Sequence, residues 1–284
     1  MDLAQPGATA ERPMTDQKQA AAALATKPHQ RFSVSAIKGE YVGILSVITG
    51  LIVWQIFSDY VIANPLFLAS PMQVLSALVS LGSSGELWPH VGTSALEFAL
   101  GYAIASVLGI AIGLLIATSS FWKSWLQPWI SGLYATPTIA LGPLFILWLG
   151  IGIWSKVLVV VLLVIFAVII NTEAGIRSTS ERYLEMMRSF GATRSQLFLK
   201  VSLPSATPFI LAGLKLGIGR GLIGVVVAEL FGSRLGLGRM VGASADSFNM
   251  PELFAAVTIL ATSGIAMTMG FTKLEARLVP WTKD

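Results

Sequence analysis

Long apolar segments alternate with short polar connections from residue 41 towards the C-terminus. An α-helix needs roughly 20 mostly apolar residues to cross a bilayer. Six segments meet that requirement: residues 41–58, 91–117, 130–149, 153–171, 207–231 and 252–271. The pattern therefore predicts an all-α membrane protein with six transmembrane helices.

The first 40 residues follow a different pattern. They are polar, rich in Ala, Gln and Thr, and show no apolar periodicity. We expect residues 1–40 to form a disordered cytoplasmic tail and residues 41–284 to form the membrane domain. The tail is not expected to be a signal peptide, because the first apolar run begins too late and is too long.

Composition narrows the choice of protein class. The chain is 54% hydrophobic and only 12% charged, with a mean hydropathy of +0.74. A soluble domain carries about 25% charged residues, so a soluble or a disordered chain is excluded. There is no cysteine, and the two histidines, His29 and His90, lie far apart. We therefore expect no catalytic site and no metal site on this chain.

The basic residues predict the orientation. With the N-terminus in the cytoplasm, 14 of the 19 basic residues fall on the inner side. Three fall outside, namely Lys156, Arg234 and Arg239. Positive charge accumulates on the cytoplasmic side of membrane proteins, so both termini are predicted to be cytoplasmic.

A short outer helix is predicted between the first two spans, over residues 70–81. Ser70 suits the N-cap position and Pro71 the first helical position. The apolar positions that follow are Val74, Leu75, Leu78 and Val79. Such a helix is expected to lie against the membrane surface.

The longest cytoplasmic connection, residues 172–206, is predicted to hold two helices, over about residues 180–190 and 193–201. Gly191 separates them, and Pro204 is expected to end the second. The apolar positions of the pair are Tyr183, Met186, Met187, Phe190, Leu197, Phe198 and Val201. Either this surface packs beneath the protein's own spans, or it is a docking surface for a partner.

The spacing within this loop resembles the EAA motif of ABC-importer permeases. In that motif Glu-Ala-Ala is followed by three residues, Gly, nine residues and Ile-x-Leu-Pro. Here Glu185-Met186-Met187 precedes Gly191 and Val201-Ser202-Leu203-Pro204 at the same spacing. Methionines replace the two alanines, and Val201 replaces isoleucine.

From about residue 40 onwards, the chain also resembles one branch of those permeases. The branch serves nitrate, taurine and alkanesulfonate importers, with relatives for bicarbonate and vitamin precursors. The matching stretches are Leu68-Ala69-Ser70-Pro71, Pro128 to Pro137, Gly142-Pro143-Leu144, Trp148 to Gly152, Leu203-Pro204, Gly213-Leu214-Lys215, Ala228-Glu229-Leu230 and Gly236-Leu237-Gly238.

The resemblance implies a type I ABC importer permease fold in a bacterial inner membrane. It implies a second permease subunit, forming a homodimer, and two separate ATP-binding subunits that hold ATP and Mg²⁺. A periplasmic binding protein would deliver the substrate. The residues implied in ATPase contact are Glu185, Met186, Met187, Phe190, Gly191 and Ala192. Leu203 and Pro204 would anchor the loop to the fifth span.

Apart from the resemblance, the sequence itself indicates that ATP is bound by another subunit. A phosphate-binding loop needs a Gly-Lys pair, and none occurs in the sequence. We therefore expect no cofactor on this chain, and nothing in it indicates a nucleic-acid partner.

Four charged residues fall within the predicted spans: Glu97, Lys215, Arg220 and Glu229. Each costs at least about 2.5–3.5 kcal/mol in mid-membrane unless it faces protein or water. One interpretation pairs them between helices. In the other, Arg220, Glu229 and Glu97 line the translocation pathway, and Arg220 attracts an anion. Thr136 and Pro137 should break the third span and add to the pathway wall.

Small residues recur at steps of four, and in one case three, in two spans. They are Gly109 and Gly113 in the second span and Gly213, Gly217, Gly221 and Gly224 in the fifth. Such stripes let helices approach closely. The fifth-span stripe is expected to pack within the chain, with a dimer contact or pore lining as the alternative.

Together these features predict the membrane subunit of an ATP-driven importer. The resemblance suggests a small anion of the nitrate, sulfonate, taurine or bicarbonate type as substrate. An alternative is an ion-coupled secondary transporter that uses Glu97 or Glu229. A membrane scaffold or receptor without transport is a further alternative.

Overall fold

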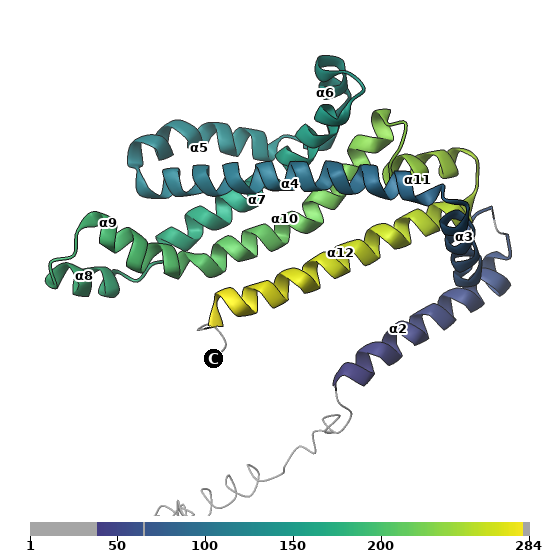
Figure 1. Ribbon diagram of the computed structural model, residues 1–284, viewed down its shortest axis with the longest axis horizontal. Coiled ribbons are helices and arrows are strands. Elements are labelled where there is room, and N and C mark those ends of the chain that lie inside the picture. The colour runs from purple at the N-terminus through teal and green to yellow at the C-terminus, as the bar shows by residue number, and fades with distance from the viewer. Residues whose placement is uncertain (1–38, 65, 281–284) are drawn as a thin grey trace, which may run out of the picture. The chain divides into compact units, whose positions relative to one another are not determined.

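Every regular element that the structure describes is a helix (Figure 1). The computed structural model describes residues 39–64 and 66–280. The chain divides into two compact units between residues 52 and 53. Helix α2 (Gly39–Ile56) begins in the first unit and continues in the second as the π-helical η2 (Phe57–Ile62). The predicted disordered tail lies, apart from its last two residues, outside the described residues.

Five helical segments in the described ranges are long and apolar enough to cross a membrane, and a bent helix pair can supply a sixth. The prediction of an all-α membrane protein with six spans is thereby confirmed. The five are α2 with η2, α4 (Leu87–Thr118), α7 (Ile153–Arg177), α10 (Leu203–Gly232) and α12 (Met250–Leu278). Helices α7 and α12 extend further than predicted, by six and seven residues at their C-terminal ends.

The third predicted span is the bent pair. Helix α5 (Ser120–Ala135) and the run of η3 (Thr138–Leu141) with α6 (Gly142–Leu149) meet at an angle of 86°. Thr136 is extended, as the residue before a proline tends to be, and Pro137 supplies no N–H to continue the helix. The predicted break is confirmed.

The predicted start of that span at residue 130 is wrong by ten residues. Helix α5 already begins at Ser120, where the Ser119 hydroxyl accepts from the Trp122 N–H. The early turns carry Lys123, whose ammonium lies 3.0 Å from Glu173 of α7. The charge of Lys123 lowers the hydropathy of the segment, so hydropathy alone placed the start of the span too late. In the folded chain, Glu173 compensates that charge.

Helix α7 packs between α4 and α10 and holds the largest share of the buried residues. Small residues of α4 meet α7 at steps of four along both helices. A Cβ added at Gly101 would lie 2.6 Å from the Val160 Cβ, and one at Gly113 would lie 2.6 Å from the Thr172 Cβ. The numbers rise together along both helices, so α4 and α7 run parallel. We call this row of contacts the α4–α7 ladder.

The glycine stripe of α10 packs against α7 next to the α4–α7 ladder, and Gly217 and Gly221 also meet Tyr102 and Phe98 of α4. A Cβ added at Gly213 would lie 2.8 Å from the Asn171 Cβ, and one at Gly224 would lie 3.1 Å from the Val160 Cα. The stripe therefore packs within the chain, as expected, and its alternative as a dimer contact is wrong. Close packing of helix backbones is what small residues allow at membrane depth.

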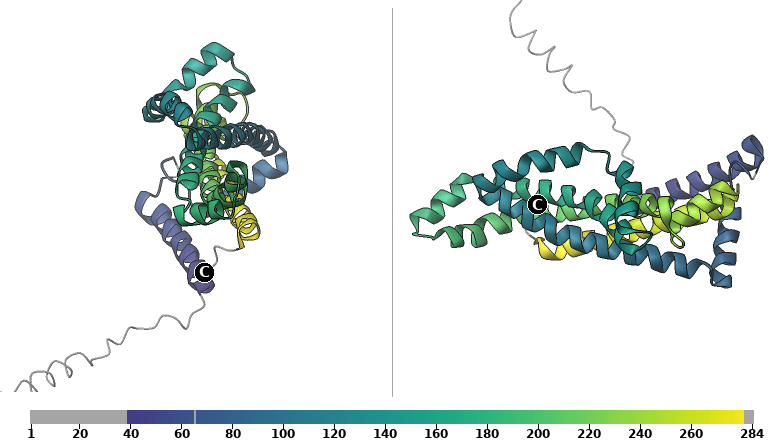
Figure 2. Two further views of the ribbon diagram at one scale, coloured as in Figure 1. Left: turned by 90° about the vertical axis from the view of Figure 1, so that its left-hand side faces the viewer. Right: turned by 90° about the horizontal axis from the view of Figure 1, so that it is seen from above.

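The predicted outer helix is α3 (Pro71–Ser84). Ser70 caps it, and the Gln73 side chain completes a capping box. Val74 is buried in a cluster with residues of α11 (Leu237–Asp246) and α12, whereas Leu75 and Val79 are exposed. Figures 1 and 2 place α3 and α11 at one end of the second unit and α8 and α9 at the other.

The connection between α7 and α10 folds as α8 (Glu181–Ser189) and α9 (Arg194–Leu197), separated at Gly191 as predicted. The prediction that Pro204 ends the second helix is wrong. The π-helical η4 (Phe198–Ser202) joins α9 to α10, so the chain stays helical from Arg194 to Gly232. Pro204 lies in the first turn of α10, where a proline is tolerated. In η4, directly before Pro204, the backbone hydrogen bonds join residues five apart instead of four apart.

Candidate functional site

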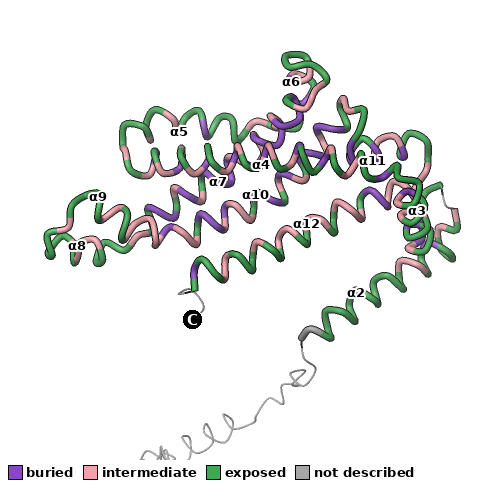
Figure 3. The backbone as a smooth tube through the Cα atoms, viewed as in Figure 1, coloured by how far each residue is buried: buried purple, intermediate pink, exposed green. Residues whose placement is uncertain are grey.

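Two regions at opposite ends of the second unit combine residues that the sequence singles out. The first is the α8–α9 hairpin, residues 181–197. Phe190 is 80% exposed, and Tyr183 and Met186 are also exposed. Neither α8 nor α9 contains a buried residue, and Figure 3 shows both helices mostly in the exposed colour. The structure therefore contradicts the alternative in which this surface packs beneath the protein's own spans.

Local hydrogen bonds fix the shape of the hairpin. Gly191 has a φ of 74°, which L side chains rarely adopt, and its N–H donates to the Arg188 carbonyl at 2.9 Å. The Ala192 N–H donates to the Met187 carbonyl at 3.1 Å, which closes the end of α8. Thr193 then caps α9 through a capping box with Gln196. The turn that presents Phe190 is thus set by short-range contacts.

The remaining predicted coupling residues lie on both sides of this turn. Glu185 is exposed on α8, and no ion pair of its side chain occurs among the described residues. Leu203 is half-buried and packs against a cluster of Ile176, Ala206 and Ile210. Pro204 follows it in the first turn of α10. Leu203 therefore connects the hairpin to the helices through packing.

The second region is a buried charge cluster at the opposite end, beginning with an ion pair. The Lys156 ammonium lies 3.4 Å from Glu97 Oε1. Lys156 is 6% and Glu97 1% exposed. They continue the α4–α7 ladder, because both lie four residues before Gly101 and Val160. Lys156 lies in the first turn of α7, at the edge of the fourth span as predicted, but it is buried there by protein contacts.

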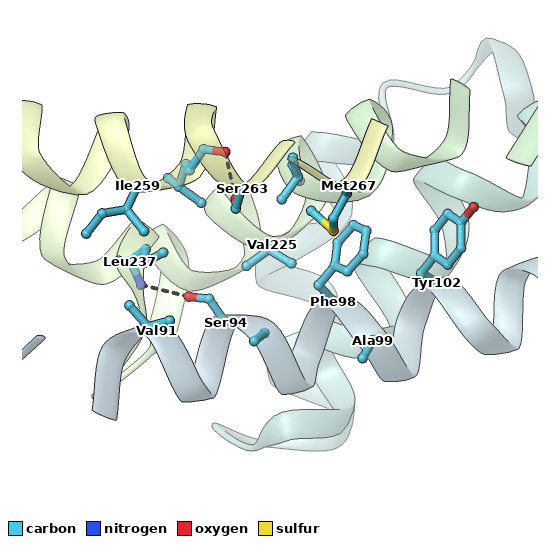
Figure 4. A pocket seen from close by; sticks show the side chains of 13 residues that line it. Val91, Ser94, Phe98, Ala99, Tyr102, Val225, Leu237, Ile259, Ser263 and Met267 are labelled. Carbon is cyan, nitrogen blue, oxygen red and sulfur yellow. Dashed lines mark hydrogen bonds between the residues drawn. The ribbon is translucent and has the colours of Figure 1, made fainter. Parts of the chain in front are cut away.

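Glu229 of α10 joins the cluster through residues 233–238, which comprise the connection from α10 and the first two residues of α11 and which we call the loop before α11. Its Oε1 accepts from the Ser94 hydroxyl at 2.6 Å and its Oε2 from the Gly238 N–H at 2.6 Å. The Ser94 Oγ in turn accepts from the Leu237 N–H at 2.8 Å, a bond drawn in Figure 4. One turn earlier on α4, His90 Nδ1 lies 3.1 Å from the Gly236 nitrogen. Side chains of α4 and α10 thus bind three consecutive residues of the loop.

The glycines of this loop are required by its close approach. Gly236 has a φ of 127°, and a Cβ added there would overlap the Glu229 carboxyl group. A Cβ added at Gly238 would lie 2.6 Å from the Val226 carbonyl oxygen. The Gly-Leu-Gly sequence supported a family resemblance, but its role came only from the structure. Likewise, no sequence pattern indicated the structural role of Ser94, His90 or Lys156. One signal was available in the sequence: Glu97 lies four residues before Gly101 and therefore on the same face of α4 as the small residues of the ladder.

The other two intramembrane charges have different surroundings. The Lys215 ammonium lies 3.5 Å from Glu275 of α12. The Arg220 guanidinium lies over the Tyr134 ring of α5, 5.7 Å from its centre, and has no ion-pair partner among the described residues. The interpretation that pairs the four intramembrane charges with each other is therefore wrong. Glu97 and Lys215 do form ion pairs between helices, but with Lys156 and Glu275.

The structure brings only part of the predicted pathway together. Tyr134, beneath Arg220, lies two residues before Thr136, whose hydroxyl donates to the Gly132 carbonyl at 2.9 Å. Pro137 is exposed at the bend. Glu97 and Glu229 lie in the buried charge cluster instead, and the exposure of Glu229 is 0%.

An apolar cavity of about 470 Å³ lies between α4, α10 and α12. Phe98, Val225, Ile259 and Met267 are among its lining residues, as Figure 4 shows. The Ser94–Leu237 hydrogen bond lies in its wall. The cavity is apolar and its wall is continuous with the buried charge cluster.

Comparison with known proteins gives a consistent result. Residues 105–283 match the family described as "Binding-protein-dependent transport system inner membrane component". The chain is 35% identical to the formylaminopyrimidine transport permease protein ThiX of Halalkalibacterium halodurans, covering 82% of this chain and 92% of the relative. It is 33% identical to the taurine transport system permease protein TauC of Escherichia coli, covering 84% and 88%. It is also 33% identical to the riboflavin transport system permease protein RibX of Chloroflexus aurantiacus, covering 75% and 80%.

Solved structures share the fold at lower sequence identity. The chain superposes on a subunit of the MetNI methionine ABC transporter in an inward-facing conformation with a TM-score of 0.57 and 16% identity. The match covers 68% of this chain and 98% of that one. An amino acid ABC transporter matches with a TM-score of 0.53 and 20% identity, covering 70% and 97%. The fold is that of type I ABC importer permeases.

Proposed function

Because the chain belongs to the family of binding-protein-dependent transport inner membrane components, the permease subunits of ABC importers, we propose that its α8–α9 hairpin couples it to separate ATPase subunits. The observation that carries this proposal is the exposed apolar surface of the hairpin, above all Phe190. An apolar patch away from lipid generally marks a protein contact.

The proposed assembly has five parts. Two copies of this chain form the substrate pathway, two ATPase subunits bind ATP and Mg²⁺, and a periplasmic binding protein delivers the substrate. Family membership supports the ATPase and the binding protein as partners. This subunit holds no nucleotide and performs no chemistry, and it changes conformation when the ATPase subunits close.

The contact itself is proposed to use the EAA-type segment. Its residues are Glu185, Met186, Met187, Phe190, Gly191 and Ala192. The exposed Phe190 and Met186 supply apolar area, and methionine side chains adapt to the shape of a cleft. Leu203 and Pro204 pass the movement to α10, because Leu203 packs on the cluster below the hairpin.

The Phe190→Ala variant tests this proposal in the assembled, full-length transporter. Truncating an aromatic residue at the centre of an interface costs about 2 kcal/mol, so we expect roughly 30-fold weaker ATPase binding. Substrate-stimulated ATP hydrolysis should fall in parallel, while the isolated permease keeps its thermal stability.

The matched control is Phe121→Ala. Phe121 is 69% exposed at the start of α5 but lies outside the hairpin. The Phe121→Ala variant should leave the affinity for the ATPase unchanged. If both variants bind the ATPase as tightly as the parent chain, the hairpin is not the coupling site.

We propose a small anion as substrate and the surroundings of Arg220 and the α5 bend as part of the pathway. Arg220 supports this because it carries a charge without an ion-pair partner among the described residues. The bend at Thr136 and Pro137 is the kind of broken helix that membrane proteins place along cavities. The prediction that Glu97 and Glu229 line the pathway stays a prediction, and both are buried in this conformation.

The relatives make the substrate test specific. Their names refer to taurine, which carries a sulfonate, and also to formylaminopyrimidine and riboflavin. Uptake of all three into proteoliposomes with the cognate ATPase and each candidate binding protein would assign the class. Arg220→Gln should reduce taurine uptake and leave assembly intact. Equal uptake by the variant and the parent chain would remove Arg220 from the pathway.

Family membership favours ATP-driven import over the ion-coupled alternative. Uptake driven by a pH gradient in liposomes that contain this chain alone would overturn that preference.

A further inference from the structure

The buried charge cluster contains more negative than positive side chains. Two carboxyl groups, those of Glu97 and Glu229, share a single cation, Lys156. Glu97 is 1% and Glu229 0% exposed. Two buried carboxylates with one ammonium leave one uncompensated charge, and an isolated buried charge is costly.

One oxygen in the cluster lacks a partner. Glu97 Oε2 is buried, and no hydrogen bond to it occurs among the described residues. Glu97 lies one turn after Ser94 on α4, and the Ser94 hydroxyl donates to Glu229 at 2.6 Å, so the two carboxyl groups belong to the same buried cluster. Two ionised carboxylates in this arrangement would repel each other, whereas a proton between them would satisfy the orphaned oxygen and cancel the excess charge.

We infer that Glu97 and Glu229 form a binding site for one proton, and that the loaded site fastens the loop of residues 233–238 to α4. The proton-binding site does not depend on the proposed coupling hairpin, which lies at the opposite end of the second unit.

The hydrogen bonds indicate which carboxyl group carries the proton. Both oxygens of Glu229 already accept, one from the Ser94 hydroxyl and one from the Gly238 N–H, as suits an ionised carboxylate. Glu97 Oε1 receives the Lys156 ammonium, which leaves Oε2 free. The proton therefore sits on Glu97 Oε2 and is donated to Glu229.

The same bonds link the proton to movement of the loop. If the loop lifts away from both α4 and α10, Glu229 of α10 loses the Gly238 N–H, and Ser94 of α4 loses the Leu237 N–H. Water then reaches the carboxyl pair, and the shared proton leaves to solvent. The closed arrangement holds one proton more than the open one, so rising pH favours opening, by at most about tenfold per pH unit.

Other titratable groups near the loop could also make its position depend on pH, so their effect must be distinguished from that of Glu97 and Glu229. On α4, His90 Nδ1 lies 2.9 Å from the Gly236 carbonyl oxygen and 3.1 Å from its nitrogen. On α7, Lys156 is the cation of the cluster. Glu86, Arg234, Arg239 and Glu252 line a neighbouring pocket of about 260 Å³ with His90. Variants must therefore distinguish Glu97 from His90.

Infrared spectroscopy of the full-length chain in lipid nanodiscs tests the proton directly. The parent chain should show the carbonyl stretch of one buried, protonated carboxyl group. Glu97→Gln should abolish that band, because its amide replaces the protonated acid and still donates to Glu229. Asp246→Asn, at an exposed site on α11, is the control and should leave the band unchanged. Absence of the band in the parent chain, or its persistence in Glu97→Gln, would overturn the inference.

Distance measurements test the link to the loop. The sequence has no cysteine, so cysteines introduced at Glu86 and Arg239 carry spin labels at defined sites. Rising pH should increase the longer-distance population in the parent chain and in Asp246→Asn. Glu97→Gln should remain closed with no pH dependence, and Ser94→Ala should open at lower pH. An unchanged pH slope in Glu97→Gln, or a slope that disappears only in His90→Asn, would overturn the linkage.

Discussion

The α4–α7 ladder and the α8–α9 hairpin both depend on glycine, but for opposite physical reasons. In the ladder, a Cβ at Gly113 would lie 2.6 Å from the Thr172 Cβ, so the limit is space. At Gly191 nothing lies within 4 Å of an added Cβ, and the limit is the backbone φ of 74°. The ladder needs glycine because two helices touch, and the hairpin needs it because the chain must turn.

This difference indicates how the two regions divide their tasks. The ladder is buried and ends in a charge cluster, so substitutions there should act mainly on stability. The hairpin has no buried residue in α8 or α9, so substitutions there should act mainly on partner binding. The predictions below test that separation, from the largest expected change in the free energy of unfolding to the smallest.

Lys156→Ala should have the largest effect. Removing one partner of a buried ion pair leaves an uncompensated charge and costs about 3–5 kcal/mol of unfolding free energy. Denaturant unfolding of the chain in detergent would measure it. The double variant Lys156→Met with Glu229→Gln should recover part of the loss, because it removes both the cation and the ionised carboxylate of the cluster. A loss below about 1 kcal/mol for Lys156→Ala would contradict a buried pair.

Gly113→Ala should cause the second-largest loss of unfolding free energy. The added methyl group overlaps Thr172, and overpacking of a filled interior costs about 1–3 kcal/mol. Gly132→Ala on α5 is the matched control, since nothing lies within 4 Å of its added Cβ. It should be neutral or stabilise the helix by about 0.5–1 kcal/mol. Equal losses from both variants would show that space is not what the ladder requires.

Gly191→Ala should cost less. A left-handed backbone position disfavours alanine by about 1–2 kcal/mol, and this strain can relax by distorting the hairpin alone. Gly191→Asn should be tolerated better, since asparagine visits this conformation more readily. We expect ATPase affinity to fall in Gly191→Ala and to recover in Gly191→Asn in a binding assay. A bulky residue at Gly191 that leaves uptake undiminished would contradict the coupling role.

Met186→Ser should have the smallest effect on stability. Met186 is 50% exposed, and surface substitutions away from special features stay within about 0.5 kcal/mol. ATPase binding should nevertheless weaken, because the variant removes apolar area from the proposed contact. A stability loss as large as that of Gly113→Ala would mean that the hairpin belongs to the packed interior.

Local patterns in the sequence predicted the local features of the fold. Hydropathy located the spans, Ser70 with Pro71 predicted the start of α3, and Gly191 predicted the break between α8 and α9. Each depends on a continuous stretch of sequence, about 20 residues for a span and one or two helical turns for a cap or a break. The start of α5 was misplaced because the partner of Lys123, Glu173, lies 50 residues further on.

The buried charge cluster shows where such reasoning stops. A stripe of small residues predicts close packing, but it does not say which stripe of another helix it meets. Lys156 lies at the edge of its span as predicted, but its burial could not be predicted because its partner, Glu97, lies 59 residues earlier. Backbone donors such as the Gly238 N–H leave no mark in a sequence pattern at all. Only the packed structure reveals that a loop glycine supplies a hydrogen bond to Glu229.

The helical run from Arg194 to Gly232 has a mechanical consequence. At a rise of 1.5 Å per residue, its 39 residues form a rod about 58 Å long, apart from the slight shortening at η4. Tilting such a rod by about ten degrees around its midpoint moves each end by roughly 5 Å, about the height of one helical turn. The hairpin continues into one end of the rod, and Glu229 lies near the other. A push delivered at α9 can therefore arrive as a displacement of the loop before α11, with η4 and Pro208 as the points at which the rod can bend.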